Sequence, residues 1–177
     1  WDVPTVEGME YDQYDNPAAH YLVWRDNGGQ ARGVSRLYPT DRSYMLQEIF
    51  PHLVTKADMP KSASVWEGSR FCVDSKLSPE QRKHIIQEIV VGYLEFSLSK
   101  QITDIVGVMY PVYWRNIFTK SGWDVEWIGD PQKSAEGHTI IAGRLPVSER
   151  VLTRVRDITG IRSTILNFGE ERFRKAA

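Results

Sequence analysis

Several features that would place a protein in a class at once are scarce or missing in this 177-residue sequence. With a single cysteine, Cys72, the chain can form no internal disulfide and can offer no cysteine cluster to a metal. The four histidines lack ligand-like spacing, so we expect no metal site. No apolar run approaches the roughly 20 residues that cross a bilayer, and no signal peptide is recognisable. These absences favour a cytoplasmic protein without a membrane span.

A large excess of charge of one sign is missing as well. Lys and Arg total 22 and Asp and Glu total 23, for a formal net charge of -1. No global basic field therefore favours nucleic acid as a partner. Without repeats or linker-like tracts, the length fits one domain, which we place at residues 1–177. Because the first residue is Trp1 and not Met, we expect that an N-terminal segment precedes it in the full-length protein.

The order of the expected elements indicates a mixed α/β domain. Strands are expected at residues 20–25, 31–38, 64–73, 102–110, 124–128 and 139–145. Residues 41–62 hold a short amphipathic piece around Met45, Ile49, Phe50 and Leu53, followed by a loop. Three longer helices are expected, from Ser78 to about residue 98, at 112–121, and from Ser148 to about residue 158, and Gly122 and Gly160 stop the last two. The run Ser78-Pro79-Glu80-Gln81 is typical of a capping box. Strands and helices alternate in the second half, which predicts a mixed sheet with helices on its faces.

Carboxylates gather ahead of the first hairpin. Glu10, Asp12 and Asp15 lie within six residues, interleaved with two tyrosines. One interpretation is an acidic, solvated loop. In the other, Asp12 and Asp15 project toward a cationic partner, which requires the loop to turn. Arg36 follows on the second strand of the hairpin. By itself it is more often a surface residue, but beside Asp12, Asp15 and Glu67 it is able to close a network of opposite charges.

Glu67 and Arg70 interrupt a strand that is otherwise apolar. A charge in a buried strand is costly unless it is paired, so a structural ion pair and an exposed edge strand are both open interpretations. Residues three apart on a strand point to opposite faces, so the two share a site only across a bulge, for which Gly68 is the candidate. On the same strand, Cys72 is expected to be a small core residue.

The joint order of these motifs resembles the acyl-homoserine-lactone synthase (autoinducer synthase) family. The resemblance is carried by residues 1–75 and rests on Trp1, Glu10-x-Asp12-x-x-Asp15, Arg36-Leu37-x-Pro39-Thr40 and Trp66-Glu67-x-Ser69-Arg70-Phe71. It implies a three-layer α/β/α sandwich with a mixed sheet, similar to the GCN5-related N-acetyltransferases, with the thioester in a V-shaped opening between two strands. The site residues that it implies are Trp1, Asp12, Asp15, Arg36, Glu67 and Arg70.

The resemblance implies an acyltransferase of the EC 2.3.1 class. The amine of S-adenosylmethionine would take an acyl group from a thioester, and the product would close to a lactone and release methylthioadenosine. Both molecules are substrates, so no cofactor is expected. Glu67 is the candidate base, while Asp12 and Asp15 would counter the substrate's positive charges. Arg36 and Arg70 would orient the substrate or brace the carboxylates, and Trp1 would lie near the adenosyl cation.

An apolar tunnel is expected for the acyl chain. Its candidate residues are Val108, Met109, Tyr110, Trp114 and Phe118, whereas Leu94 is expected in the core. The stretch 108–111 lacks the threonine that is common in family members that make 3-oxo-acyl products, which favours an unsubstituted chain. The turn at 74–78 has no glycine-rich pyrophosphate cradle. This fits an acyl carrier protein as the donor without excluding acyl-CoA.

A basic face is expected if an acidic carrier protein docks. Arg150 and Arg154 are the candidates, and a solvated helix face is the alternative interpretation. Two rival functions also stay open at this point. One is a GCN5-like N-acyltransferase acting on another amine, and the other is a non-catalytic thioester-binding module. The full set of charges at the implied site favours the enzyme, because unsupported buried charges destabilise a fold.

Overall fold

The computed structural model describes residues 5–168. A seven-stranded mixed sheet with the strand order β3-β4-β5-β6-β9-β7 forms its centre, and β8 pairs with β9 off this path. The strands of this sheet are β3 (His20–Arg25), β4 (Ala31–Pro39), β5 (Val65–Val73), β6 (Asp104–Met109), β7 (Glu126–Trp127), β8 (Gln132–Lys133) and β9 (Thr139–Pro146). A separate hairpin is formed by β1 (Thr5–Val6) and β2 (Met9–Glu10). The strands predicted from the sequence are all present, several of them shorter than expected.

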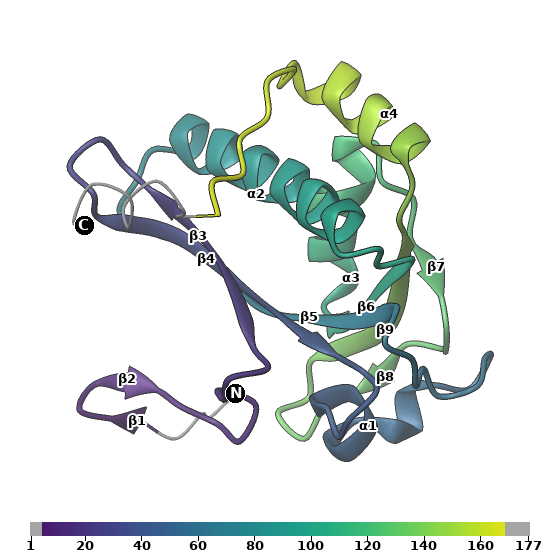
Figure 1. Cartoon of the computed structure of the whole chain (residues 1–177). Helices are drawn as coiled ribbons and strands as arrows, with labels where there is room; N and C mark the ends of the chain where they lie inside the picture. The colour runs from purple at the N-terminus through teal and green to yellow at the C-terminus, as the bar shows by residue number, and fades with distance from the viewer. Residues whose placement is uncertain (1–4, 169–177) are drawn as a thin grey trace.

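Helices cover both faces of this sheet (Figure 1). One face carries α2 (Pro79–Ser99), α4 (Glu149–Thr159) and a composite helix of α3 (Pro111–Tyr113), the π-helical turn η2 (Trp114–Phe118) and the 3-10 turn η3 (Thr119–Ser121). The opposite face carries α1 (Met45–Ile49) and the 3-10 turn η1 (Pro51–Leu53). The predicted class, an α/β sandwich with a mixed sheet, is confirmed. Within the described range, no helix is long and apolar enough to cross a membrane.

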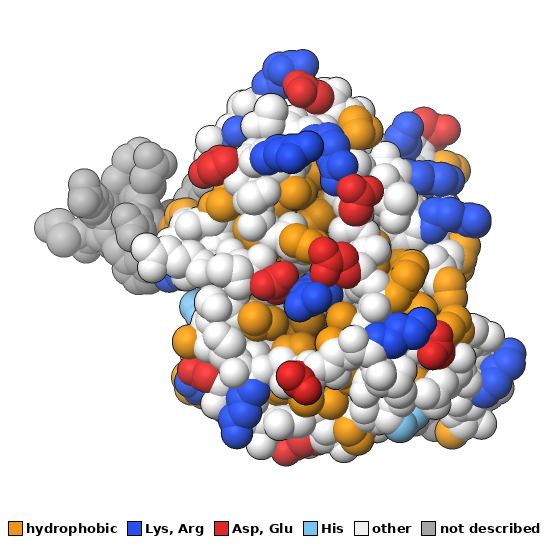
Figure 2. All heavy atoms as spheres, turned by 90° about the vertical axis from the view of Figure 1, so that its right-hand side faces the viewer, with side chains coloured by type: hydrophobic (Ala, Val, Ile, Leu, Met, Phe, Trp, Pro, Cys, Tyr) orange, Lys and Arg blue, Asp and Glu red, His pale blue; other side chains and the backbone are white. Residues whose placement is uncertain are grey.

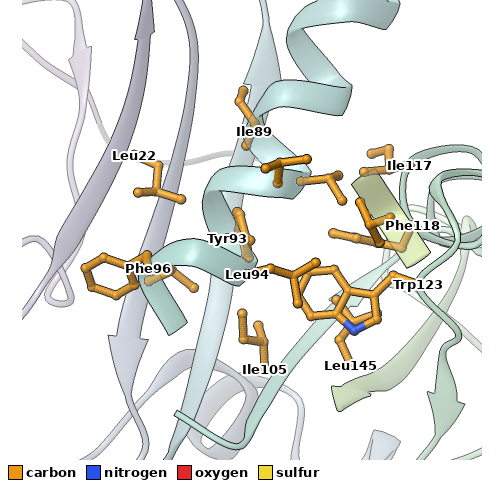
Figure 3. Packing of buried hydrophobic residues seen from close by; sticks show 14 of the residues in the cluster. Leu22, Ile89, Tyr93, Leu94, Phe96, Ile105, Ile117, Phe118, Trp123 and Leu145 are labelled. Atoms are coloured by element: carbon orange, nitrogen blue, oxygen red, sulfur yellow. The ribbon is translucent and has the colours of Figure 1, made fainter. Parts of the chain in front are cut away.

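The long helix α2 is organised as its sequence predicts. The Ser78 hydroxyl accepts a hydrogen bond from the Gln81 amide, and the Gln81 side chain accepts one from the Ser78 amide, so the capping box is present. α2 links β5 to β6, which pair in parallel, and so it crosses over the sheet. Ile89, Tyr93 and Leu94 pack from α2 into the core between the sheet and the other helices (Figure 3). Leu94 is fully buried, as expected of a core residue.

β5 and β6 pair over a short stretch only. Their register joins Val65 to Asp104 and ends where Glu67 meets Val106, although both strands continue beyond that point. In the same region a Cβ on Gly107 would lie 2.9 Å from the Gly68 carbonyl oxygen, so the two backbones approach closely just before they separate. The sheet therefore opens between β5 and β6, as the family resemblance implied.

A β-bulge lies at Arg70. Arg36 pairs with Ser69 and Val34 pairs with Cys72, so two residues of β5 lie opposite Ser35 alone. Arg70 has a φ of 51°, a left-handed conformation that a side chain other than glycine seldom adopts. The predicted bulge is present, but its prediction at Gly68 was wrong, because the irregular register begins after Ser69. The extra residue lets Ser69 and Arg70 both reach the sheet face that lies away from α2.

Two smaller expectations are corrected by the structure. The segment expected as a single helix at 112–121 is built from the three helical turns α3, η2 and η3, which together bury Trp114, Ile117 and Phe118. Cys72 is exposed and not a core residue. It pairs with Val34 on the sheet face away from α2 and points out of the main core, while Phe71 packs against Tyr93 of α2.

A buried carboxylate on α2 fixes the C-terminal part of the described chain. Glu95 lies 2.7 Å from Arg156 of α4 and accepts hydrogen bonds from the amides of Ile165 and Leu166. We expect Glu95→Gln to lower the free energy of unfolding by about 2 kcal/mol, since Arg156 would lose its ionised partner. Urea unfolding measures this change, with Glu80→Gln on the exposed first turn of α2 as the control. Equal stabilities of the two variants would contradict the expectation.

Candidate active site

A cavity of about 400 Å³ lies where β5 and β6 separate. Its wall is formed by the strands β4, β5, β6 and β9, the helices α1 and α2, the composite helix, and β2 with the loop that follows it. One end of the wall is charged and the remainder is apolar. The lining residues that carry charge are Glu10, Asp12, Arg36 and Arg70. The cavity therefore offers a polar end and an apolar end to one ligand, or to two ligands that meet between them.

Arg36 is the buried cation of the charged end. Its side chain is 1% exposed, and its Nη1 lies 2.6 Å from both Asp12 Oδ1 and Asp15 Oδ1. Its Nε donates to the Ser69 hydroxyl at 3.0 Å, and the Tyr14 ring packs against the guanidinium with its centroid 5.6 Å from Cζ. Burial alone would lower the pKa of Arg36, but its hydrogen bonds to Asp12 and Asp15 raise it above its ordinary value. Arg36 is therefore a fixed cation.

Arg70 joins the same carboxylates from the bulge in β5. Its Nη2 lies 2.9 Å from Asp12 Oδ2 and 3.2 Å from Asp15 Oδ2, and its Nη1 lies 2.8 Å from Glu10 Oε2. Burial opposes ionisation of Asp15, but hydrogen bonds from Tyr21, the Asp12 amide and Arg36 outweigh it and lower the pKa of Asp15. Three carboxylates thus meet two guanidinium groups, which leaves the cluster one negative charge in excess.

The loop that carries the carboxylates turns as the functional interpretation required. The Asp15 amide donates to the Asp12 carbonyl at 3.0 Å, and the Asp12 amide donates to Asp15 Oδ2 at 2.8 Å. Asp12 and Asp15 therefore face the same side and share both arginines. Of the residues that the resemblance implied, the structure brings together Asp12, Asp15, Arg36 and Arg70. Trp1 lies outside the described residues.

The apolar end contains every residue that the sequence suggested for the acyl chain. Val108, Met109, Tyr110, Trp114 and Phe118 all line the cavity. Trp114 is 2% exposed, and its indole N–H donates to the Ile141 carbonyl at 3.1 Å. A Cβ on Gly143 would lie 3.0 Å from the Trp114 ring, so the absence of a side chain there leaves room for the indole.

Sequence reasoning missed part of the wall. The additional lining residues are Met45, Gly68, Ser69, Phe71, Tyr93, Tyr113, Ile105, Val106, Ile117, Ile140 and Leu145. Ser69 had a signal, because its place opposite Arg36 follows from the register of β4 and β5. Met45 had none, since nothing in the sequence brings α1 to the mouth of a strand opening that begins more than twenty residues later.

Glu67 lies behind the cavity wall. It is fully buried, and it is not among the described residues that line the cavity. Its Oε1 accepts a hydrogen bond from the Leu46 amide at 2.7 Å, and its Oε2 accepts one from the Met45 amide at 3.1 Å. Burial raises the pKa of Glu67 to about 7, although these two amides and the charge of Arg36 favour the ionised form.

The raised pKa of Glu67 predicts a pH-dependent stability. Between the ordinary value near 4.5 and about 7, the folded chain holds a proton at Glu67 that the unfolded chain has lost. The contribution of Glu67 to the free energy of unfolding is therefore present below pH 4.5 and is lost as the pH rises to 7, by up to about 3 kcal/mol. In Glu67→Gln this loss should disappear. Urea unfolding at pH 5 and pH 8 measures it, and equal pH dependence in the two proteins would contradict the prediction.

The two arginines suggested for carrier-protein docking lie on α4. Arg150 is exposed, and Arg154 pairs with Asp124 at 2.8 Å. Lys and Arg side chains gather over the upper part of the face that Figure 2 shows, the region of α4, with acidic side chains among them. Within residues 5–168, no group of three or more His, Cys, Asp or Glu side chains is arranged to hold a metal ion.

Comparison with known proteins places this cavity in a family. Residues 1–155 match the sequence model of the family described as autoinducer synthase. The acyl-homoserine-lactone synthase of Agrobacterium fabrum is 32% identical over 160 residues, which cover 88% of this chain and 74% of that protein.

Solved structures agree with this match. The CoA-dependent acyl-homoserine lactone synthase BjaI, solved with SAM and isopentyl-CoA, has a TM-score of 0.81 at 27% identity, covering 93% of this chain and 75% of that one. The CoA-dependent synthase MesI has a TM-score of 0.80 at 28% identity, covering 96% of this chain and 83% of that one. Sequence and fold therefore agree that this chain belongs to the autoinducer synthase family, with acyl-homoserine-lactone synthases as its relatives.

Proposed function

We propose that the cavity joins the amine of S-adenosylmethionine to an acyl group carried by coenzyme A and releases an N-acyl-L-homoserine lactone. The observation that carries this proposal is the division of the cavity into a charged end with one excess negative charge and an apolar end. The amino-acid part of S-adenosylmethionine has an ammonium, a sulfonium and a carboxylate, and so one positive charge in excess. The charged end is complementary to it in sign and in size of charge.

The first step is acyl transfer. The ammonium loses its proton to a carboxylate or to water at the charged end, and the free amine attacks the thioester carbon. The carbon–nitrogen bond forms, the carbon–sulfur bond of the thioester breaks, and coenzyme A leaves as a thiol. Asp12 lines the cavity and, with Asp15, holds both arginines in place, so that the guanidinium groups can orient the substrate carboxylate.

The second step is ring closure within the acylated intermediate. The carboxylate oxygen attacks the γ-carbon, the bond from that carbon to the sulfonium sulfur breaks, and methylthioadenosine leaves as a neutral molecule. No redox change and no further reactant is needed. The charged end would hold the carboxylate and the sulfonium at a fixed distance, which shortens the search for the reactive geometry.

Two observations favour acyl-CoA over an acyl carrier protein as the donor. BjaI and MesI, two solved relatives of similar fold, are described as CoA-dependent. Arg154, one of the two docking candidates, is already paired with Asp124. Both substrates of the proposed reaction are available in the cytoplasm, so we place the reaction there.

The test is a mass-spectrometric assay of the full-length protein with S-adenosylmethionine and matched acyl-CoA and acyl-carrier-protein thioesters. We expect methylthioadenosine and one acyl lactone to appear in equal amounts, with a kcat/KM at least about tenfold higher for acyl-CoA. A preference for the carrier protein that Arg150→Glu abolishes would reverse the choice of donor. Amide without lactone would indicate an N-acyltransferase, and binding without turnover would indicate a thioester-binding module.

A further inference from the structure

Glu67 is a charged residue of the implied site that is not among the described residues lining the cavity. Its side chain has no exposed surface, and both of its carboxylate oxygens are occupied by backbone amides of α1. A general base must lie within hydrogen-bond reach of the proton that it removes, directly or through one water. Both oxygens of Glu67 are hydrogen-bonded to amides of α1, and Glu67 is not among the described residues that line the cavity, which favours a structural role over proton transfer.

The partner of Glu67 is a helix that depends on it. α1 spans five residues, Met45–Ile49, and a helix of that length is not stable by itself. Its N-cap residue, Tyr44, makes no side-chain capping hydrogen bond. Glu67 satisfies the first two amides of α1 from a neighbouring strand, and when it is ionised its negative charge favours the N-terminal end of the helix.

α1 in turn contributes to the cavity wall and, through Tyr14, to the support of the charged end. Met45 lines the cavity wall beside the apolar region. Glu48, one turn further along, accepts a hydrogen bond of 2.6 Å from the Tyr14 hydroxyl. The Tyr14 ring packs against Arg36, which holds Asp12 and Asp15. A shift of α1 would therefore move the wall at Met45 and loosen the support of the charged end together.

We propose that Glu67 is a positioning residue, which holds α1 so that Met45 and Tyr14 keep the cavity wall and the Arg36 cluster in register, and that it is not the proton acceptor. The kinetic assay of this inference rests on the proposed function, whereas the inference itself concerns the role of Glu67. It replaces the expectation from the family resemblance that Glu67 takes the proton of the amine.

The first test compares Glu67→Gln with the native protein between pH 6.5 and 9. Glutamine keeps one acceptor for the Leu46 amide and loses the other, so we expect kcat/KM to fall about tenfold, mainly through KM for both substrates. Because Glu67 is ionised at pH 9 and largely protonated at pH 6.5, the deficit should be at least as large at pH 9. An α-amine with a pKa near 8 has lost its proton there without help from the enzyme, so a missing base would no longer matter.

A kcat deficit of a hundredfold or more at pH 6.5 that shrinks toward unity at pH 9 would overturn the proposal, because that is the behaviour of a lost general base. A second variant covers the case in which Glu67→Gln does not fold. Met45→Pro removes the amide that Glu67 Oε2 binds and leaves Glu67 intact. Proline suits the first position of a helix, and Tyr44 before it is already extended, with φ -142° and ψ 164°.

Met45→Leu is the matched control, since it changes the same side chain and keeps the amide. We expect Met45→Pro to raise both KM values severalfold above those of Met45→Leu, and to add little when it is combined with Glu67→Gln. Identical kinetics for Met45→Pro and Met45→Leu would overturn the proposal. If the native protein turns over no thioester, the proposed function fails, whereas hydrogen exchange at the Met45 and Leu46 amides still tests the hold on α1. Unchanged exchange rates in Glu67→Gln would then overturn the inference independently of the proposed function.

Discussion

Asp12→Asn is expected to lower kcat/KM for S-adenosylmethionine by about a hundredfold and the free energy of unfolding by about 3 kcal/mol. Asp12 lines the cavity and bonds both arginines, at 2.6 Å from Arg36 Nη1 and 2.9 Å from Arg70 Nη2. When Asp12 is replaced by a neutral asparagine, the cluster loses its excess negative charge. The buried Arg36 then keeps only Asp15 as an ionised partner. Initial rates at varied S-adenosylmethionine and urea unfolding at the same pH measure the two effects.

Asp130→Asn is the matched control for this prediction. Asp130 forms an ion pair of 2.5 Å with Lys56, but both side chains are more than half exposed. Water and salt screen such a pair, so its loss should change the stability by less than about 1 kcal/mol and leave the kinetics unchanged. If Asp12→Asn and Asp130→Asn had similar effects on both measurements, the charged end of the cavity would not be a substrate site.

The charged cluster shows what a sequence pattern can predict. Opposite charges in segments far apart in the chain had to be paired, because an unpaired charge in an apolar strand destabilises a fold. The family resemblance implied that Arg36 and Arg70 orient the substrate or brace Asp12 and Asp15, and the structure places these four side chains within hydrogen-bond distance. The need for a bulge was also predictable, since alternation along β5 would otherwise separate Glu67 from Arg70.

The positions of the bulge and of α1 were not predictable. Glycine at 68 suggested the bulge by its freedom of conformation, but the register of β4 against β5 places it at Arg70. Arg70 has a left-handed conformation and pairs with three carboxylates. The short amphipathic pattern around Met45, Ile49, Phe50 and Leu53 marks α1 and η1 in the sequence, but it does not place α1 against the sheet. Its contact with Glu67 depends on how a loop packs against the sheet, which local sequence does not determine. For this reason a residue that looked like a base in the sequence is buried behind the wall.

Replacing Trp114 by leucine is expected to shift the preferred acyl chain of the donor toward greater length. The Trp114 ring lines the apolar end, fixed by its hydrogen bond to Ile141 and by the space at Gly143. A leucine would free volume along the path of the acyl chain. Each additional buried methylene contributes about 0.8 kcal/mol, so the kcat/KM ratio of a longer to a shorter acyl-CoA should rise about fourfold per methylene. Competition between pairs of acyl-CoA thioesters, with the lactones separated by mass spectrometry, measures that ratio.

Trp123→Leu provides a close control for Trp114→Leu. Trp123 is fully buried in the same core, and its indole N–H also donates to a backbone carbonyl, that of Pro146 at 2.8 Å. It is not among the described residues that line the cavity. Both variants lose a large buried ring and should be destabilised to a similar degree, but the ratio of lactones is independent of how much enzyme is folded. A shift in Trp114→Leu alone would identify its ring as the limit on chain length, whereas an equal shift in both variants would trace selectivity to a general loosening of the core.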